Sequence, residues 1–210
     1  MAVALAVWVG VYAIVAYSLL PLGGASPVLA RSFQAHEVAV YLHVFGASLA
    51  PVLGMAQFST RLRARWPAVH RWTGRFYLGV CVLVGGAAGA WLAVFAQGGA
   101  AAQAGFLCLA LAWLATGAVG LARACDGDIA GHQEWMWRNY ALTWGAVMLR
   151  VYMGVAQAIP GVTFDRAYPV VAWLAWVPNA MVVEWYLARR RRGAREGSLS
   201  ATGPGVGHCT

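Results

Sequence analysis

Long stretches of apolar residues, separated by short polar segments, are the dominant pattern of this chain. A helix needs about 20 mostly apolar residues to cross the hydrocarbon core of a bilayer. Six stretches meet that need, and they cover residues 3–20, 37–58, 76–97, 103–122, 139–159 and 168–187. The pattern predicts an all-α, polytopic integral membrane protein, with a six-transmembrane-helix bundle that forms a single domain over residues 1–192.

The two ends of the chain carry separate predictions. The first apolar stretch could be a cleaved signal peptide instead of a span, but no basic residue precedes it, as the leader of a secreted protein would require. Residues 193–210 are rich in Gly, Ser and Pro. Such a composition lacks the apolar residues needed for a packed core, so it predicts a disordered tail.

The composition agrees with a membrane protein. Hydrophobic residues make up 61% of the chain and charged residues only 10%, whereas about a quarter of an ordinary soluble domain is charged. These values exclude a disordered chain, a nucleic-acid-binding module and a typical water-soluble enzyme. The four cysteines include no C-x-x-C pair, which argues against a disulfide framework or a zinc site.

The basic residues are all arginines, and their distribution predicts an orientation. Twelve of the fifteen lie in residues 61–75, 123–138 and 189–195, which six spans would place on one side of the membrane. Two lie on the other side, and Arg150 lies inside a span. An excess of arginine marks the cytoplasmic side, so both termini are expected in the cytoplasm. The net charge of +8 therefore reports topology rather than a nucleic-acid partner.

A stripe of polar side chains is predicted along the fifth span. Asn139, Thr143, Arg150 and Gln157 lie within about 20° of one line if the helix runs unbroken from His132. Polar groups inside a membrane normally face the bundle interior or a wet cavity. The stripe is therefore expected to face inward.

Arg150 is the most costly residue of that stripe, because a mid-span arginine costs about 2.5–3.5 kcal/mol on insertion scales. Its candidate partners are Glu184, Glu37, Asp165 and Asn179. Two interpretations stay open. Arg150 binds an anion or a propionate, or it is a structural arginine bonded to backbone carbonyls or to Glu184.

The second span has a polar face of its own. His43 and Gln57 share this face with His36 and with small residues, namely Ala47, Ala50 and Gly54. Small residues allow close helix packing or the close approach of a flat cofactor. His43 is interpreted either as an interhelical hydrogen-bonding group or as part of a site. The G-x-x-x-G formed by Gly85 and Gly89 in the third span predicts helix packing.

Two further histidines, His70 and His132, precede the third and the fifth span and are expected at similar depth near the cytoplasmic face. They could bracket a haem iron, contribute to a metal site, or bind lipid headgroups together with neighbouring arginines. Spacing alone does not choose between these, because no H-E-x-x-H motif supplies further ligands. The chain also lacks a G-x-S-x-G elbow and a phosphate-binding P-loop.

Three segments carry a resemblance to a known family: HVFGASLAPVLGMAQF, RLRARWPAVHRWTGRFYL and GHQEWMWRNYALTWGAVMLRVY. They resemble the bacterial predicted membrane proteins known as domain of unknown function 2306. The matching positions are His43, Gln57, His70, Arg71, Gly74, Arg75, His132, Trp135, Met136, Arg138 and Arg150. The resemblance implies a multi-span protein of the bacterial cytoplasmic (inner) membrane and leaves the activity open.

Three hypotheses follow for the function, and whether the protein is an enzyme stays open. In the first, it is a redox protein whose haem b iron is ligated by His70 and His132, while His43 and Arg150 contact a quinone or a haem propionate. In the second, it transports a small anionic or proton-coupled solute, which Arg150 binds. In the third, it is an assembly factor without a substrate. The expected partners are the lipid bilayer, a quinone or small solute, and a second copy in a homodimer.

Overall fold

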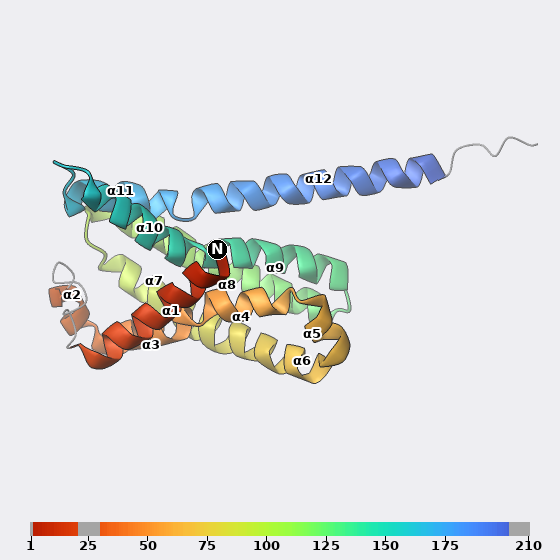
Figure 1. Cartoon of the computed structure of the whole chain (residues 1–210), viewed down its shortest axis with the longest axis horizontal. Coiled ribbons are helices and arrows are strands. Elements are labelled where there is room, and N and C mark those ends of the chain that lie inside the picture. The colour runs from red at the N-terminus through yellow and green to blue at the C-terminus, as the bar shows by residue number, and fades with distance from the viewer. Residues whose placement is uncertain (1, 21–29, 202–210) are drawn as a thin grey trace, which may run out of the picture.

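The computed structural model describes residues 2–20 and 30–201, and its regular elements there are all helices. Figure 1 shows an elongated bundle from which the last helix projects at one end. The helices are α1 (Ala2–Leu19), α2 (Ala30–Ala35), α3 (Glu37–Ser48), α4 (Ala50–Gln57), α5 (Thr60–Arg65), α6 (Pro67–Phe76), the π-helix η2 (Tyr77–Val84), α7 (Gly85–Val94), α8 (Gly99–Cys125), α9 (Ile129–Thr143), α10 (Gly145–Ala158), α11 (Phe164–Leu174) and α12 (Val177–Ala201).

Four helical segments in the described residues are long and apolar enough to cross a membrane. They are Glu37–Gln57, Pro67–Val94, Gly99–Cys125 and Phe164–Ala194. A shorter apolar helix covers Ala4–Leu19. The segment formed by α9 and α10 does not join the four, and it carries several charged residues. The protein is thus an all-α, multi-pass membrane protein, and the count of six spans stays a prediction.

The arginine-rich segments meet at one end of the bundle. Helices α5 and α6 and the turn between α8 and α9 lie at this arginine-rich end, whereas α2 and the start of α11 lie at the opposite end (Figure 1). Ion pairs join the neighbouring helices there: Arg123 with Asp128, Arg138 with Glu184, and Arg191 with Glu134. The fold thus brings the three arginine-rich segments to one end of the bundle, and their location on one side of the membrane stays a prediction.

The fifth predicted span consists of two helices, α9 and α10, which the single residue Trp144 separates. The chain stays helical through this residue, because the Trp144 N–H bonds the Tyr140 carbonyl at 3.3 Å and the Met148 N–H bonds the Trp144 carbonyl at 2.9 Å. The Trp144 backbone stays in the right-handed region (φ −64°, ψ −15°), and this division comes directly before Gly145, a residue of low helix propensity. Gly145 also lets neighbouring helices approach, since a Cβ there would lie 3.3 Å from both Leu109 and Trp176.

At the C-terminal side, α12 continues to Ala201, beyond residue 193, where the sequence predicts that a disordered tail begins. The residues that prolong it include Ala, Arg and Glu, which favour helix. Residues 202–210 lie outside the described part of the chain. The helix projects past the arginine-rich end in Figure 1.

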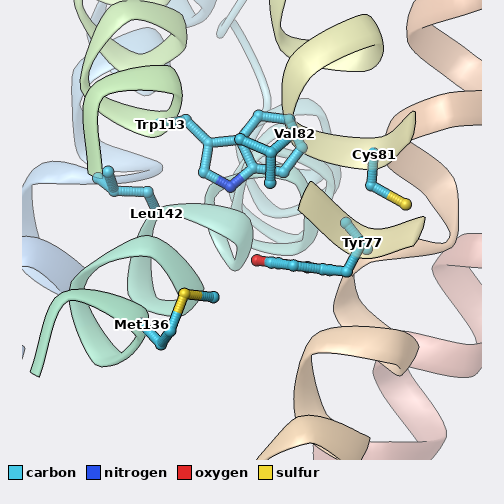
Figure 2. Packing of buried hydrophobic residues seen from close by; sticks show 7 residues of the cluster. Tyr77, Cys81, Val82, Trp113, Met136 and Leu142 are labelled. Atoms are coloured by element: carbon cyan, nitrogen blue, oxygen red, sulfur yellow. The ribbon is translucent and has the colours of Figure 1, made fainter. Parts of the chain in front are cut away.

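A π-helix occupies the beginning of the third predicted span. This segment, η2, covers Tyr77–Val84, and its Tyr77 and Cys81 are fully buried. Figure 2 shows the Tyr77 ring extending from η2 toward the helices that carry Trp113, Met136 and Leu142. Segments of π-helix are rare and often occur at functional sites, so this part of the core is of interest.

Glycines bring α3 and α7 into close contact. A Cβ on Gly46 would lie 3.1 Å from the Gly85 Cα, and one on Gly85 would lie 3.0 Å from the Ala47 nitrogen. Such distances leave no room for a larger side chain on either helix. The prediction that the G-x-x-x-G of Gly85 and Gly89 serves helix packing is confirmed.

Candidate functional site

A cavity of about 290 Å³ lies among α1, α3, α7, α8, α10 and α11. Most of its lining is apolar, with many small residues. The polar side chains in the lining are Tyr17, His43, Ser48, Gln97, Trp113, Thr143, Arg150 and Tyr168. An apolar cavity with a few convergent polar groups is the usual form of a ligand site. None of the residues that line it in the described structure is a carboxylate.

Arg150 supplies the cavity's permanent positive charge. Its guanidinium donates one hydrogen bond, of 2.8 Å, to the Ala146 carbonyl of its own helix. The phenols of Tyr17 and Tyr168, which also line the cavity, are its electrostatic neighbours. No ion pair of the described residues involves Arg150. Since a guanidinium carries five N–H donors, Arg150 keeps donors for a ligand.

Glu184 is not the partner of Arg150. It accepts two hydrogen bonds from Arg138, at 2.6 and 3.1 Å, at the arginine-rich end. This fork-on-fork geometry is the strongest form of an arginine–carboxylate contact. The interpretation that Arg150 bonds Glu184 is therefore wrong, because α12 presents Glu184 to α9 rather than to α10. The other structural interpretation, a bond from Arg150 to a backbone carbonyl, is present at Ala146.

His43 lies in the same cavity as Arg150. Its Nδ1 is 2.9 Å from the Gly85 carbonyl on α7, so the interhelical hydrogen bond considered from the sequence is present. A carbonyl can only accept, so Nδ1 carries the hydrogen, and Nε2 is left as an acceptor when the ring is neutral. Gly89 makes room for the ring, because a Cβ there would come within 2.7 Å of Nδ1.

Asn139 and Thr143 face inward, as the stripe predicts, and they belong to a buried hydrogen-bond network. The Tyr77 hydroxyl donates to Asn139 Oδ1 at 2.7 Å and lies 2.8 Å from Thr143 Oγ1. Trp113 Nε1 donates to Thr143 Oγ1 at 2.9 Å, and Asn139 Nδ2 donates to the Trp113 carbonyl at 2.7 Å. Because Trp113 and Thr143 also line the cavity, this network forms one of its walls.

The remaining residues of the predicted stripes lie elsewhere. Gln157 is exposed one residue before the end of α10, so its expected inward position is wrong. Gln57 is half-buried at the arginine-rich end, where its Nε2 donates to Thr73 Oγ1 at 2.6 Å. Together with Glu184, these residues lie outside the Arg150 cavity. The end of α10 at Ala158, directly after Gln157, explains why the stripe is shorter than predicted.

His70 on α6 and His132 on α9 both lie at the arginine-rich end, and His132 lies within electrostatic range of His70. His132 Nδ1 lies 2.7 Å from the Gly120 carbonyl, so it donates its hydrogen there and leaves Nε2 as an acceptor in the neutral ring. His70 Nδ1 is buried and has no hydrogen-bond partner in the described structure. No group of three or more His, Cys, Asp or Glu able to hold a metal ion occurs among the described residues.

Comparison with known families places the chain. The model of the DUF2306 family, described as predicted membrane proteins, matches residues 40–187. The chain belongs to this family. No curated protein and no solved structure matches it significantly. The matched range includes His43 of the cavity as well as His70 and His132. The family description names no activity.

Several residues of the site were not foreseen from the sequence, chiefly Tyr17, Tyr77, Trp113 and Tyr168. Each stands in a mostly apolar stretch, where an aromatic residue is easily taken as core or as an interfacial anchor. The available signal is the polar tip, because a hydroxyl or an indole N–H inside a membrane must find a partner. The sequence does not show which partner it finds.

Proposed function

We propose that this protein binds a small anionic solute in the Arg150 cavity and carries it across the membrane. The observation that supports this proposal is a buried guanidinium with spare donors in a cavity whose lining residues include no carboxylate. A cavity of about 290 Å³ is at the lower end of the size range of ligand sites, which favours a compact solute.

Electrostatics explain why an anion suits this place. The attraction between opposite charges grows as the local dielectric constant falls, and a planar guanidinium binds carboxylate-like groups with two parallel hydrogen bonds. Tyr17 and Tyr168 supply hydroxyl donors from α1 and α11. An anion seated at Arg150 would therefore offset the cost of holding this cation inside the bundle.

His43 makes proton coupling part of the proposal. Its free Nε2 can accept a proton, and a protonated ring would add a second positive charge to the cavity. An anion and a proton that enter together carry no net charge into the low-dielectric interior. His43 is thus the proton-accepting residue of the proposed carrier, next to the anion-binding Arg150.

The proposal includes a topology. The chain crosses a bacterial inner membrane six times, and both of its termini lie in the cytoplasm. The gathering of arginine-rich segments at one end supports this topology. The Trp113–Thr143–Tyr77 wall would have to open for a solute to pass.

Ligand-induced stabilisation tests the proposal. Benzenesulfonate should raise the melting temperature of the detergent-purified protein, whereas benzenesulfonamide, its neutral counterpart, should not. A ligand at ten times its Kd stabilises the folded state by about 1.4 kcal/mol. Arg150→Gln should abolish the rise, while Arg192→Gln, which alters an exposed arginine on α12, should keep it. An equal response from both variants would refute the proposal.

A second candidate is a redox protein with haem b, and the location of His70 and His132 at the same end of the bundle favours it. His132 has the environment of an iron ligand, because a ligating histidine usually donates its other ring N–H to a carbonyl, as His132 does to Gly120. The Nδ1 of His70 has no such partner in the described structure. A bound haem would supply one-electron transfer. Protein produced with a haem precursor should then show a Soret band that His132→Ala removes. A flat spectrum would exclude this candidate.

A further inference from the structure

The hairpin formed by α5 and α6 carries a concentrated positive charge. Its five arginines are Arg61, Arg63, Arg65, Arg71 and Arg75, and residues 59–76 contain no Asp or Glu. All except the half-buried Arg63 are exposed. Arg63 donates a hydrogen bond of 3.4 Å to the Gln57 carbonyl. The hairpin therefore presents cations that no carboxylate of its own neutralises.

Carboxylates from the rest of the arginine-rich end do not neutralise the hairpin either. Asp128 pairs with Arg123, and Glu184 with Arg138. Glu134 pairs with Arg191, whose hydrogen bonds lower the pKa of the Glu134 carboxyl. These arginines belong to α8, α9 and α12. No ion pair in the described structure reaches an arginine of α5 or α6.

An apolar stripe lies on the same hairpin. Val69, Trp72 and Phe76 are 47%, 69% and 43% exposed and recur at helical spacing on α6. Val80 and Leu83 of η2 are exposed further along the same span. Facing water, these side chains would be costly, whereas in a bilayer they contact acyl chains. The stripe therefore places α6 at the border between hydrocarbon and headgroups.

Tryptophans mark the level of this border. The Arg75 guanidinium lies 5.2 Å from the centre of the Trp72 ring, and that of Arg65 lies 5.8 Å from the Trp66 ring. Both rings are more than half exposed. Tryptophan favours the headgroup level of membranes. Each pair thus holds a guanidinium where a phospholipid carries its phosphate.

From this arrangement we infer that the α5–α6 hairpin is a binding site for an anionic phospholipid. The phosphate lies between its arginines, and the acyl chains follow the stripe of Val69, Trp72 and Phe76. Arginine forms paired hydrogen bonds with phosphate oxygens, and the anionic headgroup supplies the countercharge that the protein lacks. The site is separate from the Arg150 cavity, so it does not depend on the proposed transport.

Lipid titration of the purified, full-length protein by native mass spectrometry tests the inference. Phosphatidylglycerol should bind more tightly than phosphatidylcholine with the same acyl chains. Each arginine near an anionic surface contributes roughly five-fold in binding constant. Arg71→Gln/Arg75→Gln should therefore weaken phosphatidylglycerol binding by about 25-fold. Phosphatidylcholine binding should weaken much less, because its choline group already neutralises the phosphate.

The matched control is Arg190→Gln/Arg192→Gln, which removes the same charge from exposed positions on α12. It should keep the preference for phosphatidylglycerol. Equal losses in the two double variants would overturn the inference, because they would show an effect of total charge alone. Equal binding of the two lipids by the unmodified protein would also overturn it. If the hairpin variant does not fold, the single change Arg75→Gln, with a loss of roughly five-fold, replaces it.

Discussion

Asn139 and Arg150 illustrate two ways of placing a polar residue inside this bundle. Asn139 is fully buried, and Tyr77, Trp113 and Thr116 satisfy its amide. Among the described residues, Arg150 has one hydrogen bond, to its own helix. A fully satisfied buried group stabilises a structure, whereas a group with spare donors can bind a ligand. Asn139 thus has a structural role, whereas for Arg150 we propose a ligand-binding role.

Tyr77→Phe tests the structural role. The change removes the donor to Asn139 Oδ1 and leaves a buried acceptor without that partner. We expect the free energy of unfolding to fall by about 1–2 kcal/mol, measured by unfolding in mixed detergent and dodecyl sulfate. Tyr186→Phe, at an exposed position, should change it by less than about 0.5 kcal/mol. Equal effects of the two changes would show that the network adds nothing.

The sequence predicts which polar residues of the spans face inward, but it does not predict their hydrogen-bond partners. Periodicity identified Asn139, Thr143 and Arg150 as inward-facing, because few polar groups occur in the spans and the helical repeat aligns them. Partners depend on which helices become neighbours, and a single sequence does not show this. For that reason the sequence left Glu184 as a candidate for Arg150, although the fold pairs it with Arg138.

Among the elements, the positions of the helices followed from the apolar pattern, and their interruptions did not. Each predicted stretch coincides with a helix or a pair of helices. At Leu49 and Trp144 the backbone stays in the right-handed region. Pro51 and Gly145 follow these residues, but a lone Pro or Gly in an apolar stretch does not fix where a helix divides. The sequence does not predict the π-helix either, because its residues are ordinary apolar ones apart from Tyr77.

The close packing of α3 against α7 can be tested by substituting a glycine at their contact. In Gly89→Ala, the added Cβ would lie 2.7 Å from His43 Nδ1 and would displace the ring from the Gly85 carbonyl. We expect a loss of about 1–3 kcal/mol in the free energy of unfolding. Gly79→Ala meets no atom within 4 Å, and it should be neutral or stabilising by up to about 1 kcal/mol. A harmless Gly89→Ala would contradict the packing described.

For the whole molecule, the distribution of arginines makes the topology testable. The test uses a variant that lacks Cys108, Cys125 and Cys209. In this variant, Ala100→Cys introduces an exposed thiol at the start of α8, and Ala130→Cys introduces one at the start of α9, near the opposite end of α8. A membrane-impermeant maleimide added to intact cells should label the thiol at position 100 and spare that at position 130. The reverse pattern, or labelling of both, would contradict the orientation with cytoplasmic termini.

Transport itself is the most direct test of the central claim, that the Arg150 cavity carries a small anion. The measurement is the uptake of radiolabelled benzenesulfonate into proteoliposomes. The unmodified protein and Arg192→Gln should take it up faster than empty vesicles do, and Arg150→Gln should fall to the empty-vesicle rate. Uptake by Arg150→Gln at the unmodified rate, or no uptake by the unmodified protein, would contradict the account.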